Sequence, residues 1–378
     1  MHSAMRILIT GGRAPATLHL IRLLAHNKDH ILYTADSTSI YLSKYSNKVK
    51  KAFSYAKPNS NKDLFKRQVL QIIENNHINI LIPTCEEIYH LSEFQEEITA
   101  LNCFFMSDSL EKLIQLHSKW EFYNTCKKHA INTPETSLTI DEIPFPMIAK
   151  GIYSRSGNQI CILKDKKDFK LLEHKEAYLF QQQIEGMEIC TFSFAYNGKA
   201  HITVMYKSAY KLHKNSPNIC YHPIKDEQIE QQVNAFIEKL NWNGQIGFDI
   251  IKTSEGKIYF IECNPRLTGG IFLLDHLCLK NNFLTGKESI SSYGIRTLLY
   301  ISQFRNKEIK MLLKSKTKIK DCTFDTKDMK PFFSMYIYFL KNVVLKILKK
   351  KRITEIFVED IEWNGNTVVV KKEIKHDK

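Results

Sequence analysis

The first third of the chain alternates short apolar runs with stretches that are amphipathic at helical spacing. The apolar runs are RILIT (6–10), HILYTA (30–35), INILIPT (78–84) and NCFFM (102–106). Strands separated by helices in this order pair in parallel, because each crossover helix returns the chain to the same end of the sheet. Residues 1–117 are therefore predicted to form an α/β domain around a parallel sheet.

The turn after the first run, GGRAPATLHLI, is of the Rossmann-like kind. Gly11 and Gly12 directly follow the predicted strand, and Pro15 stands where a helix would begin, a position that suits proline. Such a turn could hold a phosphate, but the full G-x-G-x-x-G pattern is missing, so a structural turn is favoured. Asp36, after the second strand, could bind a ribose hydroxyl, although a lone acid there is more often a solvated turn residue.

The middle of the chain has a different pattern, in which strands follow one another with little helix between them. Apolar runs occur at FPMIAK (145–150), ICIL (160–163), YLFQQQI (178–184), CTFSFAY (190–196) and AHITVMY (200–206). Asn-Gly at 197–198 is a typical hairpin turn. The pattern predicts a small antiparallel unit over about 140–207, then a helix near 227–240, strands at 244–252 and 257–264, and helical segments from 270 to 304.

The last two of these strands carry acidic residues in an apolar setting. Asp249 interrupts the run GQIGFDIIK, and Glu262 lies in KIYFIECN. Side chains alternate between the faces of a strand, so Glu262 and Asn264 share one face while Cys263 points to the other. If the strands are neighbours, Asp249 faces Glu262 and Asn264 in a cluster that offers only oxygen ligands.

An all-oxygen cluster suits Mg²⁺, which commonly binds one or two carboxylates together with the phosphates of a nucleotide. Arg266 follows the chain-breaking Pro265 and could offer its guanidinium to a phosphoryl or carboxylate oxygen. The alternative is an ordinary salt bridge on the surface between two strands. The sequence therefore predicts a metal site at Asp249, Glu262 and Asn264.

Composition narrows the classes of function. The 378 residues are 43% hydrophobic and 25% charged, which is typical of a folded enzyme with more than one core. The formal net charge of +14 fits nucleic acid, an anionic membrane or a small polyanion, but the sequence has no recognisable nucleic-acid-binding module. The nine cysteines form no C-x-x-C pair, so reduced thiols and a cytoplasmic location are expected.

These motifs, in this order, resemble the ATP-grasp superfamily of carboxylate–amine ligases, including its members related to carbamoyl-phosphate synthase. FIECNPRLTGG resembles the metal-binding strand of the family, and GQIGFDII resembles the strand before it. RILITGGRAPATLHLIRLL, SKYSNKVKKAF and LIPTCEE are similar to the Rossmann-like domain that precedes the grasp fold in many members. The resemblance covers about residues 5–305 and implies ATP with Mg²⁺, or alternatively Mn²⁺, as cofactors.

The resemblance also implies which residues hold the nucleotide. HSKWEFYNTCKKHAINTPET and PMIAKGIYSRSG resemble the segments that carry two phosphate-binding lysines, here Lys119 and Lys150. A small-residue loop would close over the triphosphate through Ser154, Ser156 and Gly157. LFQQQIEGMEICT resembles the adenine hinge, in which Gln182, Gln183 and Ile184 would line adenine and Glu188 would bind ribose; Gln182 stands where a glutamate is common. Lys207 is a further candidate phosphate or substrate contact.

The implied reaction is activation of a carboxylate as an acyl phosphate, with Lys150 and Arg266 as catalytic residues, followed by attack of an amine or another nucleophile. Alternatives are a kinase of the same superfamily, whose phosphorylated product is released, and a regulatory protein that binds ATP without turnover. The expected partners are small carboxylates and amines, and no nucleic acid. A homodimer is expected only because dimers are common.

The predicted domains are 1–117, a grasp domain at 118–305 and a C-terminal extension at 306–378. The extension contains KPFFSMYIYFLKNVVLKILKKKR (330–352), which is amphipathic at helical spacing and strongly basic. It could lie weakly on an anionic membrane, or its apolar arc could pack on the core. Packing is favoured, because amphipathic helices in globular proteins usually cover a core.

Overall fold

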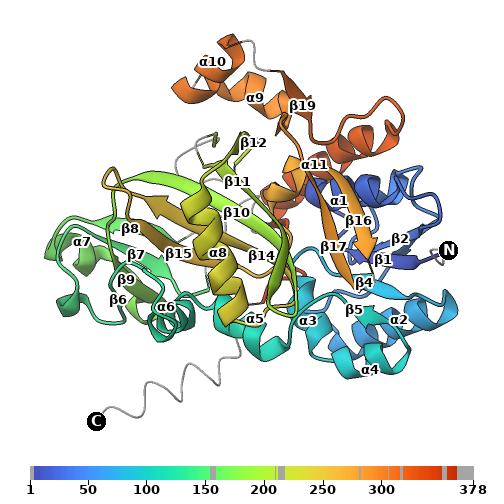
Figure 1. The fold of residues 1–378 in the computed structure, drawn as a ribbon, viewed down its shortest axis with the longest axis horizontal. Coiled ribbons are helices and arrows are strands. Elements are labelled where there is room, and N and C mark those ends of the chain that lie inside the picture. The colour runs from blue at the N-terminus through green and yellow to red at the C-terminus, as the bar shows by residue number, and fades with distance from the viewer. Residues whose placement is uncertain are drawn as a thin grey trace.

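The structure is a computed structural model, and it describes residues 4–153, 159–208, 210–211, 218–280, 282–304, 306–315, 318–350 and 356–363. Figure 1 shows the N-terminal sheet with its helices on one side of the molecule and a small green sheet on the other, with a larger sheet between them. The predicted α/β class is confirmed.

The N-terminal sheet is parallel throughout, as the alternating pattern predicts. Its order is β3-β2-β1-β4-β5, and the chain changes direction across the sheet between β1 and β4. The strands are β1 (Arg6–Thr10), β2 (Ile31–Asp36), β3 (Lys51–Ser54), β4 (Ile80–Ile82) and β5 (Phe104–Phe105). The connecting helices are α1 (Pro15–Leu24), the 3-10 helix η1 (Leu42–Tyr45), α2 (Lys62–Asn75), α3 (Glu87–Ser92) and α4 (Gln95–Ala100).

The glycine turn after β1 is structural, as favoured from sequence. Gly11 has φ +70°, and a Cβ there would lie 2.5 Å from the hydroxyl of Thr84. A Cβ on Gly12 would lie 2.7 Å from the ring of Tyr41. The backbone carbonyl of Gly12 accepts hydrogen bonds from the backbone and the hydroxyl of Ser43. Protein side chains therefore fill the space around this turn.

Asp36 is neither a solvated turn residue nor free to bind ribose, and both interpretations were wrong. Its side chain is fully buried. It accepts hydrogen bonds from the backbone of Arg13 at 2.9 Å and from the Arg13 guanidinium at 2.5 Å. The other side of that guanidinium binds Asp360 at 2.7 Å. Sequence reasoning missed this cluster because Asp360 lies 347 positions from Arg13.

Two helices lead from the N-terminal domain to a four-stranded antiparallel sheet of order β6-β9-β7-β8. The helices are α5 (Leu110–His117) and α6 (Lys119–Lys128). The strands are β6 (Thr136–Ser137), β7 (Met147–Gly151), β8 (Ile160–Leu163) and β9 (Tyr178–Gln182), with α7 (Lys166–Leu171) and the 3-10 helices η2 (Ile140–Glu142) and η3 (Lys175–Ala177) between them.

The larger sheet has the order β13-β11-β10-β14-β15. It contains β10 (Met187–Tyr196), β11 (Lys199–Lys207), β13 (Pro223–Ile224), β14 (Gly244–Lys252) and β15 (Ile258–Asn264), and α8 (Glu227–Lys239) lies across it in Figure 1. We predicted one antiparallel unit over 140–207, but β10 and β11 belong to this larger sheet. Strand pairing with β14, far along the chain, decides that division.

The segment from 270 to 304 is less helical than predicted. After the 3-10 helix η4 (Gly269–Leu273), β16 (Leu274–Lys280) and β17 (Phe283–Glu288) pair as an antiparallel hairpin. Leu274, Leu277 and Leu284 contribute to a core with the N-terminal helix α1, and this burial outweighs local helix propensity. A second small sheet joins β12 (Cys220–Tyr221), β18 (Ser292–Gly294) and β19 (Ile319–Asp321), next to α9 (Arg296–Ser302) and α10 (Lys307–Lys314).

The C-terminal part returns to the N-terminal domain. Helix α11 (Lys330–Lys349) packs on η1, and residues 356–363 lie against the loops that follow β1 and β2. Asn59 donates hydrogen bonds to the carbonyls of Glu359 and Glu362 at 3.0 and 2.9 Å. Helix α11 and residues 356–363 of the predicted extension are thus bound to the first domain, whereas α10 and β19 pack on β12, β18 and α9.

Candidate functional site

The pairing of β14 with β15 places two carboxylates opposite each other. Asp249 is in register with Glu262, and Gly247 is in register with Asn264. Residues opposite each other in an antiparallel pair project from the same face of the sheet. Cys263 is buried in the core on the other face, as the alternation predicts. The structure therefore brings Asp249, Glu262 and Asn264 to one face.

The two carboxylates are close enough to perturb each other. Burial, and then the negative charge of Glu262, raises the pKa of Asp249 to about 7. Burial acts to raise the pKa of Glu262 as well, but Lys119 and Lys150 outweigh it, and the pKa of Glu262 is lowered. Two neighbouring acids with opposite shifts behave as a pair that shares one proton near neutral pH.

Both predicted lysines lie at this acid pair. Lys119 is the first residue of α6, and its Nζ lies 3.6 Å from Oε2 of Glu262. Ser118 accepts the backbone N–H of Glu121 and so caps the helix at this point. Lys150, in β7, is buried and donates a hydrogen bond to Gln181 at 2.7 Å. Burial lowers the pKa of Lys150 to about 8, against the attraction of Glu262.

Arg266 lies at the boundary with the N-terminal domain. Its Nη2 is 3.8 Å from Oε1 of Glu86, a buried residue of the LIPTCEE segment after β4. The other oxygen of Glu86 accepts the backbone N–H of Trp363 at 3.4 Å. Trp363 packs on the rings of Tyr89 and Tyr153, with centroids 5.5 and 5.8 Å away. The C-terminal segment therefore contributes to the wall of the site, which sequence reasoning missed.

The hinge between the two sheets places neighbouring glutamines on opposite faces of β9. Gln181, not Gln182, shares the face of Lys150, and it donates onward to the hydroxyl of Thr136 at 3.1 Å. Gln182 ends β9 on the other face, and its backbone N–H donates to the carbonyl of Glu135. Gln183 and Ile184 form the half-buried loop between β9 and β10. Their predicted contact with adenine stays a prediction.

Glu188 lies near the start of β10, on the same face of the sheet as Asp249, and its side chain is exposed. Lys211 binds it at 2.6 Å and also acts to lower the pKa of Asp249. Lys207, by contrast, is in register with Ile189, whose side chain lies in the core beneath the sheet. The register places Lys207, the last residue of β11, on the face opposite Asp249, and its predicted phosphate or substrate contact stays a prediction. Lys211 is a lysine that the fold brings to Glu188 and that sequence analysis did not identify.

The donor set fits a divalent cation held together with phosphate. Within the described residues no group of three His, Cys, Asp or Glu side chains is placed to hold a metal ion. Asp249 and Glu262 provide two carboxylates, and Asn264 provides an amide oxygen on the same face. Mg²⁺ is commonly bound by one or two carboxylates and completed by substrate phosphates and water. The predicted Ser154, Ser156 and Gly157 lie outside the described residues.

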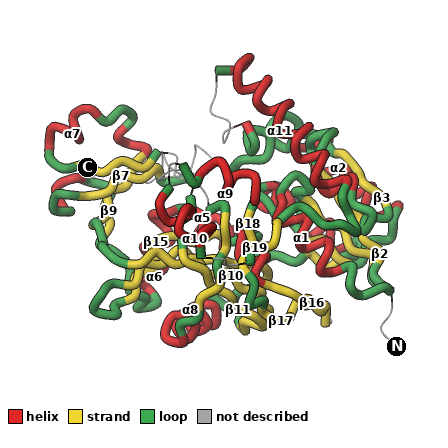
Figure 2. Tube along the Cα trace, turned by 90° about the horizontal axis from the view of Figure 1, so that it is seen from above, coloured by secondary structure: helices red, strands yellow, loops and turns green. Residues whose placement is uncertain are grey.

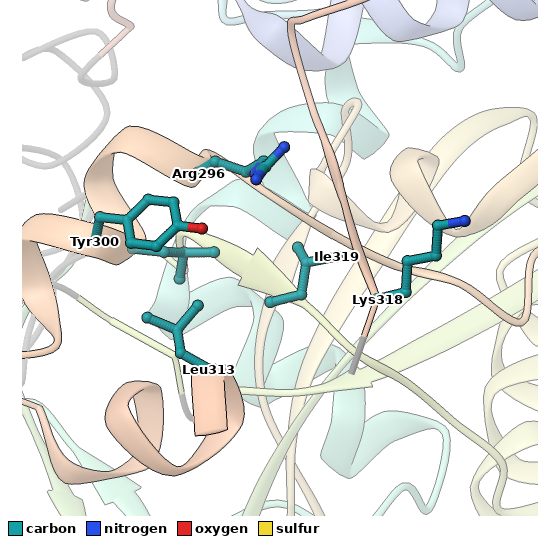
Figure 3. Close-up of a pocket in the computed structure, with 6 residues that line it drawn as sticks. Arg296, Tyr300, Leu313, Lys318 and Ile319 are labelled. Carbon is teal, nitrogen blue, oxygen red and sulfur yellow. The ribbon is translucent and has the colours of Figure 1, made fainter. Parts of the chain in front are cut away.

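A separate hollow with a volume of about 380 Å³ lies between α9, α10 and β19. Figure 3 shows its lining residues, among them Arg296, Tyr300 and Lys318. None of the predicted site residues lines it. The chemistry described above is therefore at another place in the fold.

Comparisons with known proteins identify the family that part of this chain matches. Residues 116–270 match the ATP-grasp domain family. No curated protein has a sequence that matches this chain significantly.

Solved structures with the same fold share little sequence with this chain. An L-amino acid ligase from Bacillus licheniformis is 13% identical with a TM-score of 0.57, over 71% of this chain and 69% of that one. An ADP complex of N5-carboxyaminoimidazole ribonucleotide synthetase is 12% identical with a TM-score of 0.58, over 77% and 81%. The biotin carboxylase domain of Hydrogenobacter thermophilus 2-oxoglutarate carboxylase, in complex with MgADP and bicarbonate, is 13% identical with a TM-score of 0.56, over 72% and 67%.

Proposed function

We propose, from the premise that residues 116–270 match the ATP-grasp domain family, that the protein is an ATP- and Mg²⁺-dependent ligase. It activates a carboxylate as an acyl phosphate and joins it to an amine or another nucleophile, with release of ADP and phosphate. The similar solved structures include an L-amino acid ligase and a carboxyaminoimidazole ribonucleotide synthetase, which supports this class of reaction.

The observation that carries the proposal is the acid pair with the cations around it. Asp249 and Glu262 face each other, Lys119 lies 3.6 Å from Glu262, and the charge of Lys150 acts on the same carboxylate. A structural ion pair would balance its charges locally. Here two acids stand side by side between lysines, an arrangement that suits a cation and the phosphates of a nucleotide.

The side chains would act by position and charge. Lys119 and Lys150 would bind phosphate oxygens as point charges, and Arg266 would offset charge on the transferred phosphoryl group. Asp249, Glu262 and Asn264 would hold Mg²⁺, which supplies further neutralisation of phosphate charge when bound. Gln181 accepts a hydrogen bond from Lys150 and so orients its ammonium group.

The chemistry has two steps. A carboxylate oxygen of the substrate attacks the γ-phosphorus, the new O–P bond forms, and the bond to the bridging oxygen of ADP breaks. A nucleophile then attacks the acyl carbon, the C–O bond to phosphate breaks, and the nucleophile loses a proton.

The adenine would lie at residues 182–184 and the ribose at Glu188. Because Glu188 is bound to Lys211, ribose would have to compete with or share this ion pair.

A phosphate-release assay with a library of amino acids and small acids, with and without amines, tests the proposal. We expect phosphate only when ATP, Mg²⁺, an acid and a nucleophile are all present, and none with EDTA. ADP together with a stable phosphorylated product would instead identify a kinase. ATP binding without turnover across the library would identify a regulatory protein, and either result would overturn the ligase proposal.

A further inference from the structure

Helix α11 buries mostly polar side chains and exposes apolar ones, the reverse of a helix that only covers a core. Its buried positions are Pro331, Ser334, Tyr338 and Asn342, which recur about every fourth residue and include three polar side chains. Soluble amphipathic helices normally bury their apolar stripe and expose their polar face. The expectation that the apolar arc packs on the core was therefore wrong.

The exposed face is a continuous apolar ridge. We define it by six side chains, each between 55% and 73% exposed: Phe333, Ile337, Leu340, Val344, Ile347 and Leu348. Met329 and Phe324, just before the helix, are also exposed and lengthen it. Large exposed apolar patches of this kind mark sites of protein or membrane interaction.

The polar face is held firmly to the protein, so the ridge is not the product of a loose helix. Tyr338 packs on the ring of Phe357 with centroids 5.6 Å apart. Lys341 donates a hydrogen bond to the hydroxyl of Thr38 at 3.2 Å, and Tyr336 is bonded to Thr297 at 2.8 Å. In Figure 2 the helix runs along the outside of the molecule, and one end projects away from it.

The positive charge next to the ridge indicates the kind of partner that it binds. From Lys330 to Arg352 the sequence has no Asp or Glu but contains Lys341, Lys346 and the run Lys349–Arg352. At helical spacing Lys330, Lys341 and Lys350 flank the ridge, whereas Lys346 and Lys349 lie on the opposite side, where Lys349 binds Glu359 at 2.6 Å. An apolar ridge flanked by cations matches a bilayer surface that contains anionic lipid, where apolar side chains enter the acyl boundary and cations stay at the headgroups. The net charge of +14 adds long-range attraction to such a surface.

The helix fits a position along the membrane surface better than a position across the bilayer. By length and composition alone it could cross a membrane, with a mean hydropathy of 1.3. Its buried polar face, however, holds it against the N-terminal domain, and Lys341 and Lys346 interrupt the segment. Charged residues near the middle of a spanning helix are costly.

We propose that α11 binds the protein peripherally to an anionic membrane surface, with the ridge in the headgroup region and the lysines at its border. This inference does not depend on the proposed ligase activity. It rests on the inverted burial of one helix and on the charge that surrounds it.

The test is flotation of the full chain with phosphatidylcholine vesicles, with and without phosphatidylglycerol. We expect binding to the anionic vesicles, strongest at low salt. The double variant Ile337→Ser/Ile347→Ser should reduce this binding by about tenfold or more, because it removes two apolar side chains from the ridge. Lys330→Gln/Lys350→Gln, which removes two exposed lysines at the flanks of the ridge, should reduce it by about tenfold on anionic vesicles.

Ile290→Ser is the matched control, since Ile290 is 96% exposed and lies outside the ridge. It should bind like the original chain, and all variants should keep the same melting temperature. Failure to float with anionic vesicles at low salt, equal binding to neutral vesicles, or unchanged binding of Ile337→Ser/Ile347→Ser would overturn the proposal. A dimer in sedimentation that this ridge variant dissociates, without any flotation, would instead assign the ridge to a second copy.

Discussion

Two clusters of charged side chains differ in how their acids meet the neighbouring cations. In the N-terminal cluster the Arg13 guanidinium lies between Asp36 and Asp360, at 2.5 and 2.7 Å. It also donates to the hydroxyl of Ser37 and to the carbonyl of Phe357. In the second cluster Asp249 and Glu262 face each other, and the pKa of Asp249 is raised by burial and by its neighbour to about 7.

The difference separates structure from function. A guanidinium whose donors all meet protein acceptors has no remaining donor for a ligand. The role of the N-terminal cluster is therefore structural, because Arg13 links Asp36 of β2 to Asp360 of the C-terminal segment. The acids of the second cluster face each other, and Lys119 approaches Glu262 only to 3.6 Å, so repulsion between the two carboxylates persists. Adjacent carboxylates with shifted pKa values are typical of sites that bind a cation or a phosphorylated ligand. The same reasoning explains why a Rossmann-like turn at Gly11 is not the nucleotide site proposed here.

The largest effect is expected from Asp36→Asn. It removes one negative partner of a buried ion pair, and it should lower the free energy of unfolding by about 3–5 kcal/mol. Urea denaturation measures this. If the free energy of unfolding falls by less than about 1 kcal/mol, as for ion pairs on a protein surface, the N-terminal cluster does not stabilise the fold as proposed.

Glu262→Gln should have the opposite profile. The fold should be retained, because Glu262 is only half-buried and glutamine keeps its size and shape, while turnover falls by at least a hundredfold, about 2.7 kcal/mol. Phosphate release measures the turnover, and circular dichroism checks the fold. Retained Mg²⁺-dependent activity would refute the metal assignment of Glu262.

Asp249 should make the stability of the metal-free protein depend on pH. Its folded pKa is raised from 3.8 to about 7, so the folded state holds a proton that the unfolded chain loses. The resulting stability is present below pH 4 and is lost as pH rises through 7, with a slope of up to about 1.4 kcal/mol per pH unit. In EDTA, Asp249→Asn should therefore gain stability relative to the original chain between pH 5 and 8. Parallel curves would contradict the raised pKa.

The smallest effect is expected at Gln181, which accepts the hydrogen bond of Lys150 and donates to Thr136. Gln181→Leu should raise the KM for ATP by about fivefold, or about 1 kcal/mol, with little change in kcat, because Lys150 loses an orienting partner. Steady-state kinetics separate the two constants. A fall in kcat alone would assign Gln181 a role in the chemical step.

Local sequence was enough to predict features that depend on one strand and the strand next to it. The alternating runs predict the parallel sheet, and the positions of Asp249 and Glu262 on adjacent strands predict their meeting. Local sequence was not enough for Asp36, whose partner Asp360 is far along the chain, or for the sheet face of Lys207, because a single step of register exchanges the faces of a sheet. It also could not identify Glu86 or Trp363 as parts of the site wall.

The sequence by itself determined the strands and helices of the N-terminal sheet and the order of the motifs in residues 116–270, which match the ATP-grasp family, because hydrophobic period and turn residues act over a few positions. Tertiary structure decided which face of α11 is buried and which acids are neutralised. Those outcomes depend on contacts between distant segments, such as Tyr338 with Phe357 and Arg13 with Asp360. The two carboxylates of β14 and β15 lie side by side because the register of these strands places Asp249 opposite Glu262.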